Sequence, residues 1–293
     1  MFVRQSRIGG RLDGVTGDVP PGGAFDGGRF QVYDQGAHIT DWSPYGEPVL
    51  FTSSEAVLLP GNPIRGGIPV CFPWFAAGRG GGKRPSHGFA RTTPWWLGYA
   101  SEDHEMTTLE WRLGPDQMRE SDGYRQFNRK VEVGCTQVFG EELSIDFQVR
   151  NIDDDDLSYE IALHTYLRVG DATAITLDGL GGCDYFDKVT GTEDTQIGPL
   201  QLTGETDRIY QSVGDVTVTD PELSRRITVS KENSHQTVVW NPWKDKAREL
   251  TDLADDEWRD MVCVETANVG RSAVRLQPGE IHVMRARIGV ELL

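Results

Sequence analysis

Alternation of apolar and polar residues runs through this chain and constrains its fold more than any other feature. The pattern is clearest over residues 143–150, 160–169 and 284–292. Successive side chains of a β-strand point to opposite faces, so a period of two predicts half-buried strands. A similar series precedes Gly140, Glu141 and Glu142, which supply a turn, so residues 130–150 are predicted to form a hairpin.

Shorter strand patterns recur between clusters of Gly, Pro, Asp and Asn: RFQVY, AITLDGL, DVTVTD, RITVSK and QTVVWNPW. Only residues 245–261 have much helical character, and we expect a short surface helix or two helical turns there. Strands do not alternate with long helices, which argues against a doubly wound parallel sheet. With no evident linker or repeat, the sequence predicts an all-β protein in which residues 1–293 form one large antiparallel domain.

The balance of charge limits the partners of this chain. Its 29 Lys and Arg residues stand against 45 Asp and Glu residues, a formal charge of −16. Such a chain repels nucleic acid and anionic membranes, so any anion that it binds must meet a locally basic pocket. The acidic run over residues 152–158, IDDDDLS, is predicted to be a solvated hairpin loop rather than a metal site.

The sequence shows no pattern typical of membrane insertion, secretion or paired cysteines. No stretch reaches the roughly 20 apolar residues of a membrane span, and MFVRQSRIGG at the N-terminus lacks the apolar run of a secretion signal. The four cysteines form no C-x-x-C pair. Apolar neighbours make Cys71 and Cys263 structural thiols rather than nucleophiles. We expect a reduced cytoplasmic monomer with no metal, cofactor, membrane or nucleic-acid partner.

One long interval contains no acidic residue. No Asp or Glu lies between Glu55 and Glu102, although about seven would be expected at the chain's average frequency. A buried segment that excludes all charge would also lack acids, but the basic residues of the interval argue against this alternative: Arg65, Arg79, Lys83, Arg84 and Arg91, besides His87. An anion-binding role is therefore favoured.

Details within this interval agree with an anion site. Two glycines follow Arg65 in PIRGGIPVCFPWF and would let the backbone approach a ligand closely. The guanidinium group presents a planar fork of donors that suits phosphate oxygens. The nearby GRGGGKR does not match the G-x-x-x-x-G-K-[ST] pattern of a phosphate loop.

Two side chains are candidates for proton transfer. In a strand over residues 261–269, Glu265 shares a face with Met261 and Cys263, and apolar surroundings raise the pKa of a carboxyl group. A structural glutamate paired with a buried arginine is the alternative. His164 lies opposite the Ile161–Val169 stripe, and a lone strand histidine is more often structural than catalytic. It has no second histidine at metal-ligand spacing, and the residues alone do not show that His164 and Glu265 meet.

Several motifs, in the same order, resemble those of the hexose-6-phosphate mutarotases (glucose-6-phosphate 1-epimerases) of the aldose 1-epimerase superfamily. Between residues 36 and 269 they are GAHITDW, PIRGGIPVCFPWF, HGFARTTPW, ALHTYLRVGD, TDRIY, VVWNPW and VCVETANV. The arginine motif followed by HGFAR is specific, since ordinary galactose mutarotases lack this arginine pair. The resemblance implies a galactose-mutarotase-like β-supersandwich with the ligand in a cleft on a concave sheet.

The resemblance also implies roles for individual residues. The family's motifs assign catalysis to His164 and Glu265, phosphate binding to Arg65 and Arg91, and sugar binding to His87 and Asp207. Family members often have proline after the catalytic glutamate, whereas this chain has Thr266. No cofactor or metal is implied.

The activity implied by the resemblance is interconversion of the α and β anomers of glucose 6-phosphate and related hexose 6-phosphates. The expected partner is thus a small-molecule sugar phosphate, and whether Glu265 and His164 lie on opposite sides of its ring is a question for the structure. An aldose 1-epimerase acting on unphosphorylated sugars and a non-catalytic module that binds sugar phosphates are the alternatives. A glycoside hydrolase would need a second carboxylate, and none is obvious.

Overall fold

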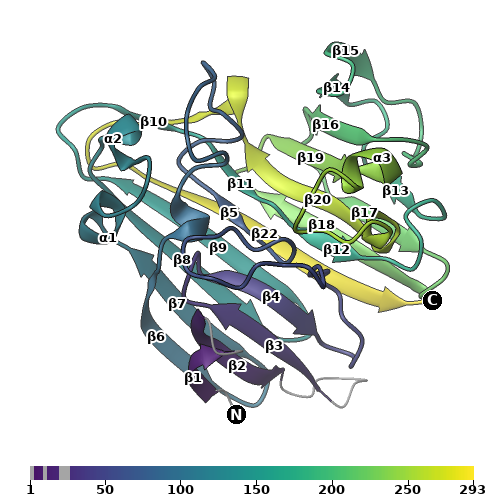
Figure 1. The fold of residues 1–293 in the computed structure, drawn as a ribbon, viewed down its shortest axis with the longest axis horizontal. Helices are drawn as coiled ribbons and strands as arrows, with labels where there is room; N and C mark the ends of the chain where they lie inside the picture. The colour runs from purple at the N-terminus through teal and green to yellow at the C-terminus, as the bar shows by residue number, and fades with distance from the viewer. Residues whose placement is uncertain (1–2, 9–11, 20–26) are drawn as a thin grey trace.

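The computed structural model describes residues 3–8, 12–19 and 27–293, which form antiparallel sheets with a few short helices (Figure 1). One eight-stranded sheet, called here the β9 sheet, contains in spatial order β13 (Thr176–Asp178), β17 (Val216–Asp220), β18 (Arg225–Glu232), β22 (Ile281–Leu292), β9 (Leu143–Asn151), β8 (Val131–Phe139), β7 (Thr107–Leu113) and β6 (Trp96–Glu102). The predicted hairpin over 130–150 is confirmed as β8 and β9, and the predicted C-terminal strand as β22.

The second eight-stranded sheet, called here the β20 sheet, contains in spatial order β15 (Thr192–Thr195), β14 (Asp184–Asp187), β16 (Thr206–Tyr210), β19 (Gln236–Asn241), β20 (Met261–Asn268), β11 (Ile161–Leu163) and β5 (Val70–Cys71), and β12 (Tyr166–Arg168) also pairs with β20. Strand β20 is therefore central, with neighbours on both sides. A residue in its middle is shielded from water by those neighbours.

Smaller elements complete the described part of the chain. A four-stranded sheet contains β1 (Val3–Ile8), β2 (Leu12–Val19), β3 (Gly28–Tyr33) and β4 (His38–Ser43), and a two-stranded one contains β10 (Leu157–Tyr159) and β21 (Val274–Leu276). The α-helices are α1 (Pro115–Arg119), α2 (Tyr124–Phe127) and α3 (Trp243–Ala247), with 3-10 turns at Ala90–Thr92, Glu257–Asp260 and Gly270–Ser272. None of the described helices is long and apolar enough to cross a membrane.

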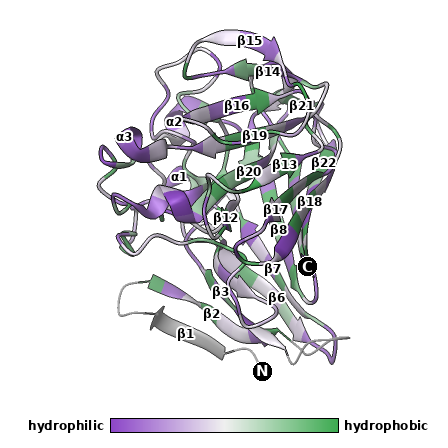
Figure 2. Ribbon diagram, turned by 90° about the vertical axis from the view of Figure 1, so that its right-hand side faces the viewer, coloured by the Kyte–Doolittle hydropathy of each residue, from purple (hydrophilic) through white to green (hydrophobic). Residues whose placement is uncertain are grey.

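The main core lies between the two large sheets. Phe147 of β9 and Met284 of β22 belong to the same buried cluster as Val262 and Val264 of β20. The four-stranded sheet covers another part of the β9 sheet, where the rings of Phe30 and Phe139 stack 4.1 Å apart. Hydrophobic residues follow the strands of both layers, whereas helices α1 and α3 are mostly hydrophilic (Figure 2). The all-β prediction is confirmed.

Two local predictions need correction. The strand predicted over 160–169 is interrupted at His164 and Thr165, which lie between β11 and β12. The 152–158 loop is solvated, as predicted, but it does not close a hairpin because β9 and β10 belong to different sheets. The helical prediction for 245–261 is confirmed as two short segments, α3, which begins at Trp243, and a 3-10 turn at Glu257–Asp260. The sequence pattern does not predict α1 and α2, since elements this short show no helical period.

Residues 1–2 and 9–11 lie outside the described part, so the N-terminal segment MFVRQSRIGG is described only over β1.

Candidate active site

Glu265 lies in the middle of the central strand β20 and is only 1% exposed. The predicted alternation is confirmed: Met261 and Cys263 pack in one apolar cluster and Ala267 in another. Val264, with the opposite orientation, belongs to the main core between the sheets. Glu265 therefore sits on the outer face of the β20 sheet, between two apolar clusters.

Strand register places His164 directly opposite Glu265. Leu163 pairs with Thr266 and Tyr166 pairs with Cys263. The same register therefore places residue 164 opposite residue 265. His164 Nε2 lies 3.3 Å from Glu265 Oε1. The two side chains are therefore in contact, which the sequence alone does not show.

Aromatic side chains hold the His164 imidazole in place. Its ring stacks on that of Tyr166 at 4.8 Å, and the edges of Trp240 and His87 meet it at 6.0 and 5.8 Å. His164 is 8% exposed, and its Nδ1 atom has no hydrogen-bond partner among the described residues. The neighbouring rings leave the imidazole little freedom to turn.

Burial and neighbouring charges perturb both groups of the pair. Burial lowers the pKa of His164 well below its ordinary value, and the charges of His87, Arg65 and Arg91 lower it further. Burial raises the pKa of Glu265 well above its ordinary value, Asp207 raises it further, and Lys188 and Arg91 oppose this rise. Burial thus favours the form in which the carboxyl group holds a proton and the imidazole is neutral.

Arg65 is fixed by two partners from distant parts of the chain. Its Nε and Nη2 atoms donate to Asp252 Oδ1 at 3.1 and 3.0 Å, and its Nη1 atom donates to the hydroxyl of Tyr166 at 3.0 Å. The Arg65 side chain remains 21% exposed. Although the sequence around Arg65 contains no acidic residue, Arg65 is paired with a carboxylate in the fold, because Asp252 of another segment contacts it.

Arg91 and His87 lie near the same pair. An Arg91 Nη2 hydrogen bond to the Ser86 carbonyl measures 2.9 Å, while its buried Nε atom has no partner among the described residues. The ring of His87 meets that of Phe75 at 4.7 Å, and burial followed by the charge of Arg91 lowers the His87 pKa. The structure thus brings both predicted arginines and His87 into the electrostatic surroundings of His164.

Asp207 forms an ion pair that sequence reasoning misses. Lys188 Nζ lies 2.6 Å from Asp207 Oδ2, and the backbone N–H of Lys188 donates to the Asp207 carbonyl at 2.8 Å. Lys188 Nζ also lies 5.4 Å from the centre of the Phe75 ring. Burial raises the pKa of Asp207, and Lys188 counteracts this rise. Lys188 is therefore a further cation near Glu265.

The sequence pattern also misses Asp252, Tyr166 and Trp240 as neighbours of the site. Asp252 lies within the segment predicted to be helical, where an acidic residue is unremarkable in sequence. The alternation places Tyr166 on the same face as His164, which is the one signal that could have found it. Trp240 reaches the site because β19 pairs with β20, and a single sequence does not reveal that pairing.

The two glycines after Arg65 serve the packing of the protein itself. A Cβ atom at Gly66 would lie 2.4 Å from Thr52 Cα, and one at Gly67 would lie 2.0 Å from the Ile39 carbonyl oxygen. The space expected for a ligand is thus filled by backbone from other segments, which corrects that interpretation.

Other predicted features show no reactive chemistry. Cys71 and Cys263 are fully buried, and burial raises the pKa of both thiols, in agreement with structural cysteines. Within the described ranges, no three His, Cys, Asp or Glu residues are grouped so that they could hold a metal ion. His164 and Glu265 therefore remain candidates for proton transfer.

The fold is that of the galactose mutarotase-like class. A solved structure from Salmonella typhimurium, named a "putative mutarotase", matches with a TM-score of 0.86 and 28% identity over 97% of this chain and 92% of that one. A galactose mutarotase-like protein from Clostridium acetobutylicum shares the fold with a TM-score of 0.74, at 12% identity over 100% of this chain and 99% of that one.

The chain belongs to the aldose 1-epimerase family, whose model matches residues 24–289. A relative in Escherichia coli K12 is 34% identical over 239 residues, covering 80% of this chain and 77% of the relative. One in Cenchrus ciliaris is 31% identical over 268 residues, covering 85% and 78%. Both are named "Putative glucose-6-phosphate 1-epimerase". The predicted family resemblance is confirmed.

Proposed function

We propose that this protein interconverts the α and β anomers of glucose 6-phosphate and related hexose 6-phosphates by opening and closing the sugar ring. The observation that carries the proposal is the 3.3 Å contact between His164 and Glu265 beside several cations. The anomeric hydroxyl oxygen and the ring oxygen are bonded to the same carbon. Two neighbouring proton carriers can therefore exchange protons with both oxygens in the same step.

Ring opening requires one proton to leave and one to arrive. Glu265, as a carboxylate, takes the proton of the anomeric hydroxyl while protonated His164 gives its proton to the ring oxygen. The bond between the anomeric carbon and the ring oxygen breaks, and the electron pair of the former O–H bond completes the aldehyde. The aldehyde turns, and closure on its other face reverses both transfers. Each positioned proton transfer is typically worth about 10²–10⁴ in rate.

The pair contains the right number of protons in either form. A carboxylic acid beside a neutral imidazole has the same total number of protons as a carboxylate beside an imidazolium. The two forms differ only in which group holds the shared titratable proton. Transfer of that proton from Glu265 to His164 across their contact produces the catalytic form without a proton from solvent. Lys188 and Arg91 favour this transfer at Glu265, because each lowers the pKa of its carboxyl group.

A phosphate group would assist the same transfer at His164. Arg65 and Arg91 lower the pKa of His164 in the ligand-free protein. A phosphate anion bound by these arginines would offset their positive charge and favour protonated His164. Binding of the phosphate, which is remote from the anomeric carbon, would thereby favour the protonated His164 that ring opening requires.

An aldose 1-epimerase that acts on unphosphorylated sugars is the second candidate. The observation in its favour is the ion pair of Arg65 with Asp252, which already engages two donors of the guanidinium fork. The phosphate is supported instead by the partial exposure of Arg65 and by the buried Nε atom of Arg91, which has no partner among the described residues.

The catalytic roles are tested by replacing each proton carrier alone. We expect His164→Ala and Glu265→Gln each to reduce anomer interconversion by about 10²–10⁴, measured by exchange NMR on glucose 6-phosphate. Circular dichroism should show an unchanged fold. Replacing Val213, an exposed loop residue, by Ala provides a control for surface changes. Near-normal interconversion by either variant of the pair would exclude its assigned role.

A further inference from the structure

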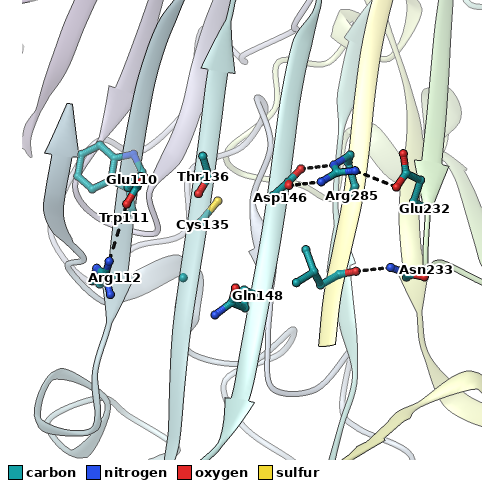
Figure 3. Close-up of a pocket in the computed structure, with 12 residues that line it drawn as sticks. Glu110, Trp111, Arg112, Cys135, Thr136, Asp146, Gln148, Glu232, Asn233 and Arg285 are labelled. Carbon is teal, nitrogen blue, oxygen red and sulfur yellow. Dashed lines mark hydrogen bonds and ion pairs between the residues drawn. The ribbon is translucent and has the colours of Figure 1, made fainter. Parts of the chain in front are cut away.

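A hollow lies on the outer face of the β9 sheet, away from His164 and Glu265. It has a volume of about 450 Å³, and its lining comes from β7, β8, β9, β22 and the end of β18 (Figure 3). The polar lining includes Arg112, Gln148, Asp146, Arg285 and Glu232. Since the main core covers the inner face of this sheet, the hollow and the candidate active site belong to opposite faces of the sandwich.

The hollow exists because one strand residue has no side chain. Strand register places Gly134 between Arg112 on β7 and Gln148 on β9. A Cβ atom at Gly134 would meet only the Trp111 carbonyl oxygen, at an ordinary contact distance of 3.9 Å. Gly134 is thus not required by packing or by a left-handed backbone, and its effect is to leave this space open.

The charges that line the hollow nearly balance, with three carboxylates against two guanidinium groups. Arg285 binds Asp146 at 2.6 Å and Glu232 at 2.8 Å, and Arg112 lies 3.8 Å from Glu110 (Figure 3). Both arginines of the lining therefore already face carboxylates. Such a surface offers many hydrogen-bonding groups with little attraction for an anion, and it suits a neutral ligand rich in hydroxyl groups.

Two exposed aromatic rings extend this surface along the edge strand β6. Trp96 is 59% exposed and Tyr99 is 52% exposed. Residues three apart in a regular strand face opposite ways, but an irregularity at Gly98 changes this: Trp96 pairs with Arg112 and Tyr99 pairs with Glu110. Both aromatic residues therefore share the face that carries the hollow.

Gly98 also brings one of these rings beside the lining. A Cβ atom at Gly98 would lie 3.2 Å from Arg112 Nε and 3.6 Å from Trp96 Cζ3, so both groups lie over this glycine. From β6 to β22 the surface crosses four strand spacings, about 19 Å at roughly 4.8 Å each. The surface is thus long enough for a chain of sugar rings rather than a single one.

We propose that this face is a second, non-catalytic binding site for a neutral gluco-oligosaccharide. The C–H faces of a pyranose ring are apolar and would pack on Trp96 and Tyr99. Its hydroxyl groups would bond to the side-chain amide of Gln148 and to the paired charges around Arg285. This site is independent of the proposed epimerase activity, because it uses the other large sheet.

Isothermal titration of the full chain with maltohexaose and cellohexaose tests the proposal. We expect at least one of them to bind, and Trp96→Ala to weaken that binding about tenfold or more, as for a central aromatic contact. Gly134→Val, which fills the hollow, should have the same effect. Gly214→Val is the matched control, since Gly214 also has open space and lies in an exposed loop.

Three results would overturn the proposal. The first is that neither hexasaccharide binds, and the second is that binding is unchanged in both Trp96→Ala and Gly134→Val. The third is loss of binding in His164→Ala, which would assign the sugar to the candidate active site. Sedimentation of the same samples adds a check: a wild-type dimer that Trp96→Ala dissociates would assign this face to a second copy of the chain.

Discussion

At the scale of single residues, the candidate site depends on a buried pair whose protonation is set by its surroundings. His164, in the break between β11 and β12, lies opposite Glu265 of β20 in the same register. Burial disfavours charge on both, while Arg91 and Lys188 act on Glu265 in the opposite direction. The position of one proton between two atoms in contact therefore decides whether the pair is ready for catalysis.

Binding of an anion should change the titration of His164. Arg65 and Arg91 lower its pKa in the free protein, so we expect saturating inorganic phosphate to raise that pKa, because the anion offsets their charge. More of the imidazole is then protonated at any pH near the midpoint. Nitrogen-15 NMR titration with and without phosphate measures this, with sodium chloride at equal ionic strength as the control. An unchanged or lowered pKa would contradict a phosphate site at these arginines.

Lys188 should contribute to catalysis through Asp207 and Glu265. Its ammonium group lies 2.6 Å from Asp207 Oδ2 and lowers the pKa of Glu265. We expect Lys188→Met to reduce kcat/KM about tenfold, the loss of one charge-assisted hydrogen bond of about 1.5 kcal/mol. Its pH profile should also move, because the carboxylate of Glu265 then forms only at higher pH. Lys188→Arg keeps the charge and should restore the profile; equal profiles for Met and Arg would argue against an electrostatic role.

At the scale of elements, the site depends on how segments distant in sequence pack against one another. Residues 66 and 67 cross the backbone of Phe51–Thr52 and of Ile39–Thr40 so closely that no side chain fits. This crossing fixes the backbone just after Arg65. It links the position of that arginine to β4 and to the segment that follows it.

Gly67→Ala should therefore destabilise the protein more than a comparable glycine substitution elsewhere. Gly67 and Gly61 both have left-handed backbone, with φ of +60° and +81°, but only Gly67 is crowded. We expect Gly61→Ala to cost about 1–2 kcal/mol from backbone strain alone, and Gly67→Ala to cost clearly more because the added carbon meets the Ile39 carbonyl. Urea unfolding of both variants compares them. Equal losses would show that the close crossing is relieved at little cost.

The sequence predicts elements better than it predicts their pairing. Alternation identifies β8, β9, β20 and β22 because each has one apolar face towards the main core. It does not show the break at His164, since both segments around it keep the same register on β20. Contacts between distant segments, such as Arg65 with Asp252 and Asp207 with Lys188, follow from strand order and loop paths that one sequence does not contain.

At the scale of the whole molecule, two large sheets share one buried core. The main cluster contains residues from Val15 to Ile288 and joins both sheets to the four-stranded one. We propose on this ground that residues 1–293 form a single domain. The candidate active site lies on the outer face of the β20 sheet, and the proposed oligosaccharide site on that of the β9 sheet, so their functions can be separated by substitution.

Exchange NMR on the two anomers decides whether the preferred substrate is a hexose 6-phosphate. With the wild-type protein, we predict a higher kcat/KM for glucose 6-phosphate than for glucose. Arg91→Ala should remove most of that preference while the glucose reaction persists. A wild-type kcat/KM for glucose equal to or above that for glucose 6-phosphate would exclude a preference for the phosphorylated sugar.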